Sequence, residues 1–251
     1  MVCPAPEKQK IVIHIFKDPE TLLPAVADFV VATARTSIER RGRFNFVLSG
    51  GSSPKKLYEL LASEKYRDDI TWQKVYFFFG DERYVPLDHP DSNFRMVQHT
   101  LFMPLAVSSE QVFKVDTTKQ PAQAAADYEQ RIRQHFENGE CRFDLILLGL
   151  GDNSHTASLF PHTDVLHERT ALINEVFVEE VDMYRITFTA PLINAAHDIA
   201  FLVYGASKRE AVRHILKDGE NIEEYPAQLI RPEKGTLHWF MDEAAAGRGD
   251  Y

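Results

Sequence analysis

Short runs of apolar, β-branched and aromatic residues recur along the chain and predict a series of buried strands. The six clearest runs cover residues 11–16, 44–48, 75–79, 143–148, 199–204 and 237–241. Between several of them, apolar residues recur at the three- and four-residue spacing of an amphipathic helix, as in residues 23–38 and 122–136. Strands that alternate with helices predict an α/β fold with a largely parallel sheet covered on both faces.

No internal repeat and no long Pro-, Gly- or Ser-rich linker divides the chain, so we expect one domain over residues 1–251. The least regular segment is 88–113, which contains Pro90 and Pro104. A short helix is predicted after Ser92, and the rest of this segment could form a flap or a partner surface. The sequence leaves both alternatives open.

Four polar, glycine-marked stretches begin at or just after the ends of predicted strands. They cover residues 49–54, 80–83, 149–155 and 205–208. The carboxyl ends of parallel strands meet at one edge of a sheet, where open α/β folds bind their ligands. The sequence therefore predicts one site to which all four stretches contribute.

The first stretch has the features of an anion-binding turn between a strand and a helix. Gly50 and Gly51 free the backbone, Ser52 and Ser53 follow, and Pro54 suits the first position of a helix that Ser53 would cap. A phosphate would gain from the free N–H groups and the helix dipole. The alternative is a well-capped tight turn, since the Walker and Rossmann glycine spacings are absent.

Two basic residues are candidates for the same anion. Lys208 begins a predicted helix, where a cation opposes the helix dipole, and an anionic partner would explain its position. Arg185 could add a forked contact to a phosphate. A solvated surface charge is the alternative for each residue taken alone.

His155 is the strongest candidate for acid–base chemistry. It ends a glycine-rich turn and precedes a predicted helix over 156–160, whose N-terminus would keep the imidazole neutral. Asp81 and Arg83 follow another strand, and Arg83 could bind an anion or a developing oxyanion. The alternatives are a packing histidine and a structural pair between Arg83 and a carboxylate.

Composition narrows the classes of partner. The chain has 28 basic and 37 acidic residues, a net charge of −9 and no long basic run, which argues against nucleic acid. An anionic substrate would need a locally positive pocket. Cys3 and Cys141 cannot build a disulfide framework or a cysteine metal site. We recognise no targeting segment and no membrane-length apolar run, so we expect a cytoplasmic protein.

At these stretches the sequence resembles the 6-phosphogluconolactonases, within a group that includes the glucosamine-6-phosphate deaminases. The resemblance covers nearly the whole chain. It rests on residues 48–54, 80–86 with 92–93 downstream, 149–151 with 155–161, 185–187, and Gly205 with Lys208. Arg83 and the run 156–160 are similar to the lactonases, because the deaminases have a tyrosine at the position of Arg83 and a different run.

The resemblance implies a three-layer α/β/α sandwich of modified Rossmann-like type. It also implies hydrolysis of 6-phospho-D-glucono-1,5-lactone to 6-phosphogluconate in the pentose phosphate pathway, with no metal and no organic cofactor. The implied partner is the phosphorylated sugar lactone. The sequence leaves the oligomeric state open between a monomer and a weak dimer.

One departure from the family pattern lies beside the candidate base. The lactonases usually have Asp-Gly before the histidine, whereas this chain has Asn153 and Ser154. Either His155 works with lower basicity beside Asn153, or Asp152 supplies the carboxylate through a shifted loop. Ser154 would cost about 1–2 kcal/mol if its backbone is left-handed.

These features together suggest a mechanism in which His155 deprotonates the water that attacks the lactone carbonyl. The loop 50–53, Arg185 and Lys208 would hold the phosphate, Asp81 would line the site, and Arg83 would stabilise the oxyanion. One rival is an isomerase-deaminase that uses Asp81 as a carbon base. Another is a non-catalytic sugar-phosphate sensor, which would need a DNA-binding module where only about ten residues precede the first strand.

Overall fold

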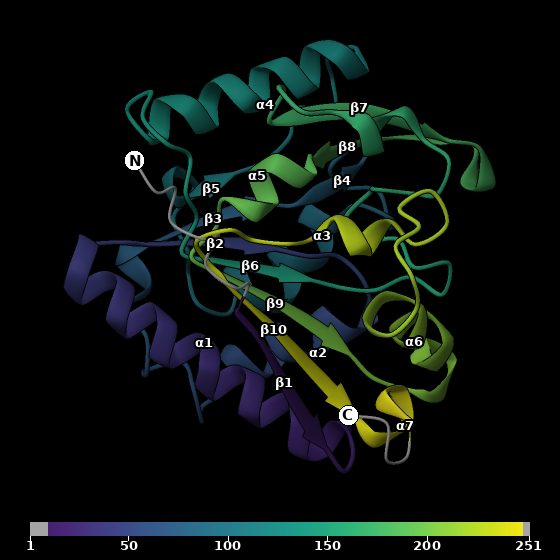
Figure 1. Ribbon diagram of the computed structural model, residues 1–251. Helices are drawn as coiled ribbons and strands as arrows, with labels where there is room; N and C mark the ends of the chain where they lie inside the picture. The colour runs from purple at the N-terminus through teal and green to yellow at the C-terminus, as the bar shows by residue number, and fades with distance from the viewer. Residues whose placement is uncertain (1–9, 248–251) are drawn as a thin grey trace, which may run out of the picture.

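The computed structural model of the protein describes residues 10–247. Cys3 and the N-terminal residues in which a targeting segment was sought lie outside this range. The order of elements alternates strands and helices along most of the chain (Figure 1).

Seven parallel strands form the central sheet, in the order β1-β10-β9-β6-β2-β3-β5. Their bounds are β1 Lys10–Phe16, β2 Phe44–Leu48, β3 Val75–Phe79, β5 Val112–Phe113, β6 Leu145–Leu148, β9 Asp198–Val203 and β10 Thr236–Asp242. The parallel sheet predicted from the apolar runs is confirmed. β6 begins two residues later than the run 143–148, although the backbone of Asp144 still bonds to Asn45 and Asp198 on the two neighbouring segments.

Helices cover both faces of this sheet, and each face has its own apolar cluster. α1 (Pro19–Arg41), α2 (Ser52–Leu61) and α3 (Asn93–Val97) pack on one face. α4 (Pro121–His135), α5 (Ala190–Asn194), α6 (Arg209–Leu216) and α7 (Glu243–Ala246) contribute to the cluster on the other. Figure 1 shows α1 and α4 on opposite sides of the sheet. The α/β architecture with three layers is confirmed.

α1 is the one helix among the described residues that is long and apolar enough to cross a membrane. Its composition has another explanation, because Leu22, Val26 and Val30 are completely buried in the core against the sheet. Asp18 caps the start by accepting from the Thr21 N–H at 2.9 Å, and Gly42 ends the helix in a left-handed conformation. α1 is therefore built as a core helix.

A second, antiparallel sheet was not predicted. It has the order β4-β8-β7, from strands β4 (Asp81–Arg83), β8 (Met183–Phe188) and β7 (Ile173–Val178), and it lies beneath α4 (Figure 1). The N–H of Phe188 donates to the carbonyl of Gly80 at 2.8 Å, which ties this sheet to the end of β3. This connection brings β4 and β8 to the carboxyl edge of the central sheet.

Two local predictions need correction. The helix over 156–160 is wrong: the segment is a turn with a single bridge between Thr156 and Leu159, and Ala157 has a left-handed φ of 48°. Segment 88–113 is also more ordered than predicted. After α3 comes a π-helix, Gln98–Phe102, and the fully buried Leu101 anchors it to the core. This part of the segment is core structure and not a separate flap.

Candidate active site

The four polar stretches meet around a cavity of about 250 Å³ at the carboxyl edge of the central sheet. β2 and β6 are neighbours there, while the chain proceeds from β2 toward β3 and from β6 toward β9. This reversal is the switch point at which open α/β sheets bind ligands. The lining comprises Ser49, Gly50, Gly51, Ser52, Ser53, Pro54, Asp81, Arg83, Gly149, Leu150, Gly151, His155, Thr156, Ala157, Leu202, Val203, Tyr204 and Lys208.

The turn after β2 opens one wall of the cavity. The Tyr58 hydroxyl fixes it by bonding both the N–H and the carbonyl of Ser49 at 2.9 Å. α2 starts at Ser52, so Gly51 and not Ser53 is the N-cap; its φ of 104° suits glycine, and no side chain caps the helix. The first turn of α2 therefore borders the cavity with free N–H groups, from which an anion can accept hydrogen bonds.

Two arginines face each other on the small sheet. Arg83 of β4 is paired with Arg185 of β8 in the antiparallel register, where opposed side chains lie on one face of the sheet. The Nε atoms of both are buried without a hydrogen-bond partner. Burial, and after it the charge of Arg83, lowers the pKa of Arg185. A half-buried and a buried cation, whose Nε donors have no partner among the described residues, predict an anion between or beside them.

Arg83 does not form the structural carboxylate pair that was one reading of the sequence. Its Nη1 donates to the carbonyl of Asp91 at 2.9 Å. The adjacent Glu82 is buried and accepts from the backbone N–H groups of Arg83, Asn93 and Phe94. Burial raises the pKa of Glu82 to about 7 in spite of these bonds. Glu82 therefore holds the loop to α3 in place.

Asp81 lines the cavity and is held by two polar residues that the sequence analysis did not assign to the site. Ser158 donates its hydroxyl to Oδ2 at 2.8 Å, and the Asn93 amide donates to Oδ1 at 3.3 Å. Asn93 was part of the family motif at residues 92–93, but no contact with Asp81 was predicted for it. Ser158 was expected to lie in a helix over 156–160, so no role in the site was predicted for it. The pair orients a carboxylate beside the remaining groups of the cavity.

His155 lies in a shielded position with a defined ring orientation. Its Nδ1 is 2.5 Å from Asn153 Oδ1, and its ring stacks on Phe160 with centroids 3.9 Å apart. An amide oxygen only accepts, so Nδ1 carries the proton and Nε2 keeps a lone pair. Burial lowers the pKa of His155 to about 4, with Lys208, Arg185 and Arg83 acting in the same direction and Asp81 opposing them. The ring is neutral because of burial and nearby cations, since no helix follows it.

In the loop before His155, Asn153 and not Asp152 contacts the imidazole. Asp152 points to Lys208, with Oδ1 and Nζ 2.7 Å apart, so the alternative in which Asp152 supports His155 is wrong. Lys208 therefore has an anionic partner already, although that partner is mostly exposed. Ser154 is buried with a φ of 63°, so the left-handed backbone on which its expected cost depended is present.

The cavity combines a neutral imidazole, the Arg83 guanidinium and a helix N-terminus, while Arg185 lies opposite Arg83 in the small sheet and does not itself line the cavity among the described residues. Such a site can bind an anionic molecule and remove a proton from water or from a bound hydroxyl. Among residues 10–247, no three His, Cys, Asp or Glu side chains are grouped so that they could hold a metal ion.

Comparison with known proteins gives consistent matches over most of the chain. The family described as glucosamine-6-phosphate isomerases/6-phosphogluconolactonase matches residues 17–239. A 6-phosphogluconolactonase from Nostoc sp. is 40% identical over an alignment of 241 residues. The alignment covers 94% of this chain and 97% of that protein.

Two solved structures show the same fold. The crystal structure of the devB protein has a TM-score of 0.86 and 33% identity, covering 95% of this chain and 99% of that one. The crystal structure of 6-phosphogluconolactonase from Thermotoga maritima has a TM-score of 0.81 and 31% identity, and the match covers 93% of this chain and 100% of that chain.

Proposed function

Because the chain belongs to the family of glucosamine-6-phosphate isomerases and 6-phosphogluconolactonases, we propose that it hydrolyses 6-phospho-D-glucono-1,5-lactone to 6-phospho-D-gluconate. The observation that carries this proposal is His155, whose protonated Nδ1 leaves Nε2 free to act as a base in a cavity that Arg83 also lines. The reaction is a step of the pentose phosphate pathway.

His155 acts as general base and then as general acid. Nε2 takes a proton from water as the water oxygen bonds to the lactone carbonyl carbon. When the bond from that carbon to the ring oxygen breaks, the same proton passes to the ring oxygen, and the product carboxylic acid ionises. A positioned base supplies a factor of about 10² to 10⁴. An oxyanion donor, the role we assign to Arg83, supplies about 10² to 10³.

The substrate phosphate binds through the groups that the structure leaves without strong partners. Gly50, Gly51, Ser52 and Ser53 offer the N-terminus of α2, and Arg185 offers its buried Nε. Lys208 exchanges the exposed Asp152 carboxylate for the phosphate, because a dianion competes well with a solvated carboxylate. Asp81 then accepts from a sugar hydroxyl.

The rival reaction in the same family is isomerisation and deamination of an amino sugar phosphate. Asp81 would serve as the carbon base, but here Ser158 and Asn93 both donate to it. Those bonds place a donor on each carboxylate oxygen and fix the orientation of Asp81, so a carbon acid would have to displace one of them. A sugar-phosphate sensor without catalysis would keep the arginines but would not need His155 in a defined tautomer.

The remaining expectations belong to this proposal. The chain works as one domain, without metal or organic cofactor, as a cytoplasmic monomer or weak dimer. Its acidic net charge and its two cysteines agree with a cytoplasmic, non-nucleic-acid-binding enzyme.

A substrate panel tests the proposal. Purified protein is given freshly made 6-phosphogluconolactone, unphosphorylated gluconolactone and glucosamine-6-phosphate, with acid release and ammonia release followed against the spontaneous rates. We expect fast ring opening of the phosphorylated lactone, a much higher KM for the unphosphorylated one, and no ammonia. Ammonia release, or no acceleration of lactone opening, would contradict the proposal.

A further inference from the structure

We propose that Glu180 is a positioning residue that fixes the reactive tautomer of His155 through the side-chain amide of Asn153. Glu180 lies in the 3-10 turn Glu179–Val181 between β7 and β8, 27 residues away from Asn153 in the chain. The inference rests on the function proposed for His155, and it adds a residue that does not touch the cavity.

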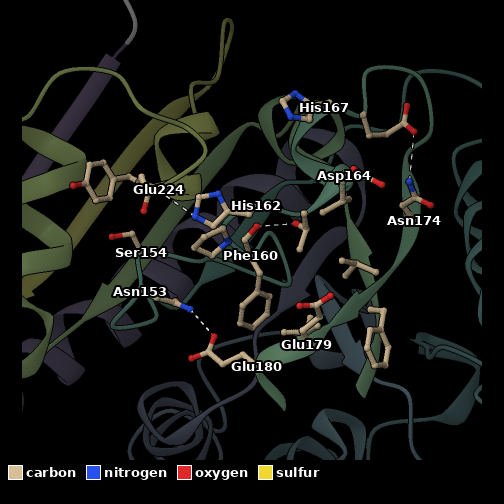
Figure 2. Close-up of a pocket in the computed structure, with 18 of the residues that line it drawn as sticks. Asn153, Ser154, Phe160, His162, Asp164, His167, Asn174, Glu179, Glu180 and Glu224 are labelled. Atoms are coloured by element: carbon tan, nitrogen blue, oxygen red, sulfur yellow. Dashed lines mark hydrogen bonds and ion pairs between the residues drawn. The ribbon is translucent and has the colours of Figure 1, made fainter. Parts of the chain in front are cut away.

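The three side chains form a continuous chain of hydrogen bonds. Asn153 Nδ2 donates to Glu180 Oε2 at 3.0 Å, and Asn153 Oδ1 lies 2.5 Å from His155 Nδ1. Figure 2 shows the amide of Asn153 and the carboxylate of Glu180 pointing toward each other. The same amide oxygen also accepts from the backbone N–H of His155, at a longer 3.3 Å.

A carboxylate partner determines which way the amide faces. A carboxylate only accepts, so the NH₂ group of Asn153 must face Glu180 and the amide oxygen must face the imidazole. If the amide turned over, its NH₂ group would donate to Nδ1. The proton of the neutral ring would then sit on Nε2, and His155 could not accept a proton from water.

Glu180 acts from a different cavity. Asn153, Phe160 and Glu180 line a neighbouring open pocket (Figure 2), whose volume is about 1040 Å³. His155 instead lines the cavity of about 250 Å³. Among the described residues, neither Glu180 nor Asn153 lines the smaller cavity. Substitution of Glu180 should therefore affect kcat and leave KM unchanged.

The first experiment compares kcat and KM for the lactone in three variants. Glu180→Ala should lower kcat by roughly threefold to tenfold, the size of one lost net hydrogen bond, with KM unchanged. Glu180→Gln should restore kcat to within about twofold, because its amide oxygen still accepts from Asn153. Glu179→Ala is the matched control, since Glu179 lies in the same turn and the same pocket, while the carboxylate that Asn153 Nδ2 donates to is that of Glu180.

The second experiment repeats the Glu180→Ala substitution in the Asn153→Asp background. A carboxylate at position 153 accepts from Nδ1 directly, needs no partner for its orientation, and would repel Glu180. Glu180→Ala should then leave kcat unchanged or raise it. A merely structural role of Glu180 in the turn predicts the same loss in both backgrounds, and that result would overturn the proposal.

A third readout does not depend on the reaction. Imidazole ¹⁵N chemical shifts, assigned with a His155→Gln sample, should report the Nδ1–H tautomer in the wild-type protein and a mixture of tautomers in Glu180→Ala. An unchanged tautomer would overturn the positioning role. If the tautomer changes but the wild-type protein opens no lactone, the positioning role stands and the proposed function fails.

Discussion

Gly151 has no room for a side chain, and the group that a side chain would meet is the proposed base. A Cβ at this position would lie 2.1 Å from His155 Nδ1 and 2.3 Å from its Cε1, where ordinary contact begins at 3.4 Å. The backbone of Gly151 is not left-handed, so alanine fits the local conformation and the clash alone decides the outcome. The imidazole would have to retreat by more than about 1 Å, and such a displacement of a catalytic group costs a factor of about 100 in rate.

The retreat is restricted because Phe160 is stacked on the ring and Asn153 holds Nδ1. We therefore expect Gly151→Ala to lower kcat for lactone opening about 100-fold, with a smaller effect on KM. Gly219→Ala is the control, since a Cβ there meets nothing within 4 Å. Thermal unfolding shows whether both variants are folded. A folded Gly151→Ala protein with wild-type kcat would refute the assigned position of the base.

Three further predictions concern pH, backbone strain and the lysine pair. Burial lowers the pKa of His155 to about 4, and only the neutral ring acts as a base, so kcat/KM should stay constant as the pH falls through 6.5 and should decrease only as the pH approaches about 4. A decrease in kcat/KM centred near pH 6.5 would contradict this. Ser154→Gly should raise the free energy of unfolding, measured in urea, by about 0.5–1 kcal/mol, because the relief of left-handed backbone strain exceeds the entropy that glycine adds to the unfolded chain. A lower free energy of unfolding would show that the buried Ser154 hydroxyl contributes more stability than the strain removes. Asp152→Ala should lower KM for the lactone by roughly twofold to fivefold, because it removes an exposed ion pair, worth under about 1 kcal/mol, that competes with the substrate for Lys208. An increased KM would mean that Asp152 orients the lysine for substrate.

The sequence predicted the elements whose signal is local. β3 is a continuous run of apolar and aromatic residues and β2 is interrupted only by Asn45, and their observed bounds are those predicted, 75–79 and 44–48. β4 consists of Asp81, Glu82 and Arg83, three charged residues that carry no local signal for a strand. It becomes one by pairing with β8, which follows about a hundred residues later. Long-range pairing of this kind cannot be read from periodicity.

The same distinction holds for the site. His155 and the turn after β2 were identified because each follows a buried strand at the carboxyl edge of the sheet. The helix predicted after His155 was wrong because Ser158 bonds to Asp81, 77 residues away, and to Thr187 on β8. The contact between Asn153 and Glu180 likewise depends on tertiary placement. Asn153, two residues from His155, was predictable as the group that orients the imidazole, whereas the distant partners Ser158 and Glu180 were not.

The most direct test of the account is kcat for 6-phosphogluconolactone in His155→Asn, measured beside His162→Asn. His162 is exposed in the neighbouring pocket and its left-handed backbone, with a φ of 59°, accepts asparagine. We expect His155→Asn to lower kcat by about 10² to 10⁴ with little change in KM, and His162→Asn to retain wild-type rates. Full kcat in the His155→Asn protein would contradict the central claim that this imidazole activates the attacking water.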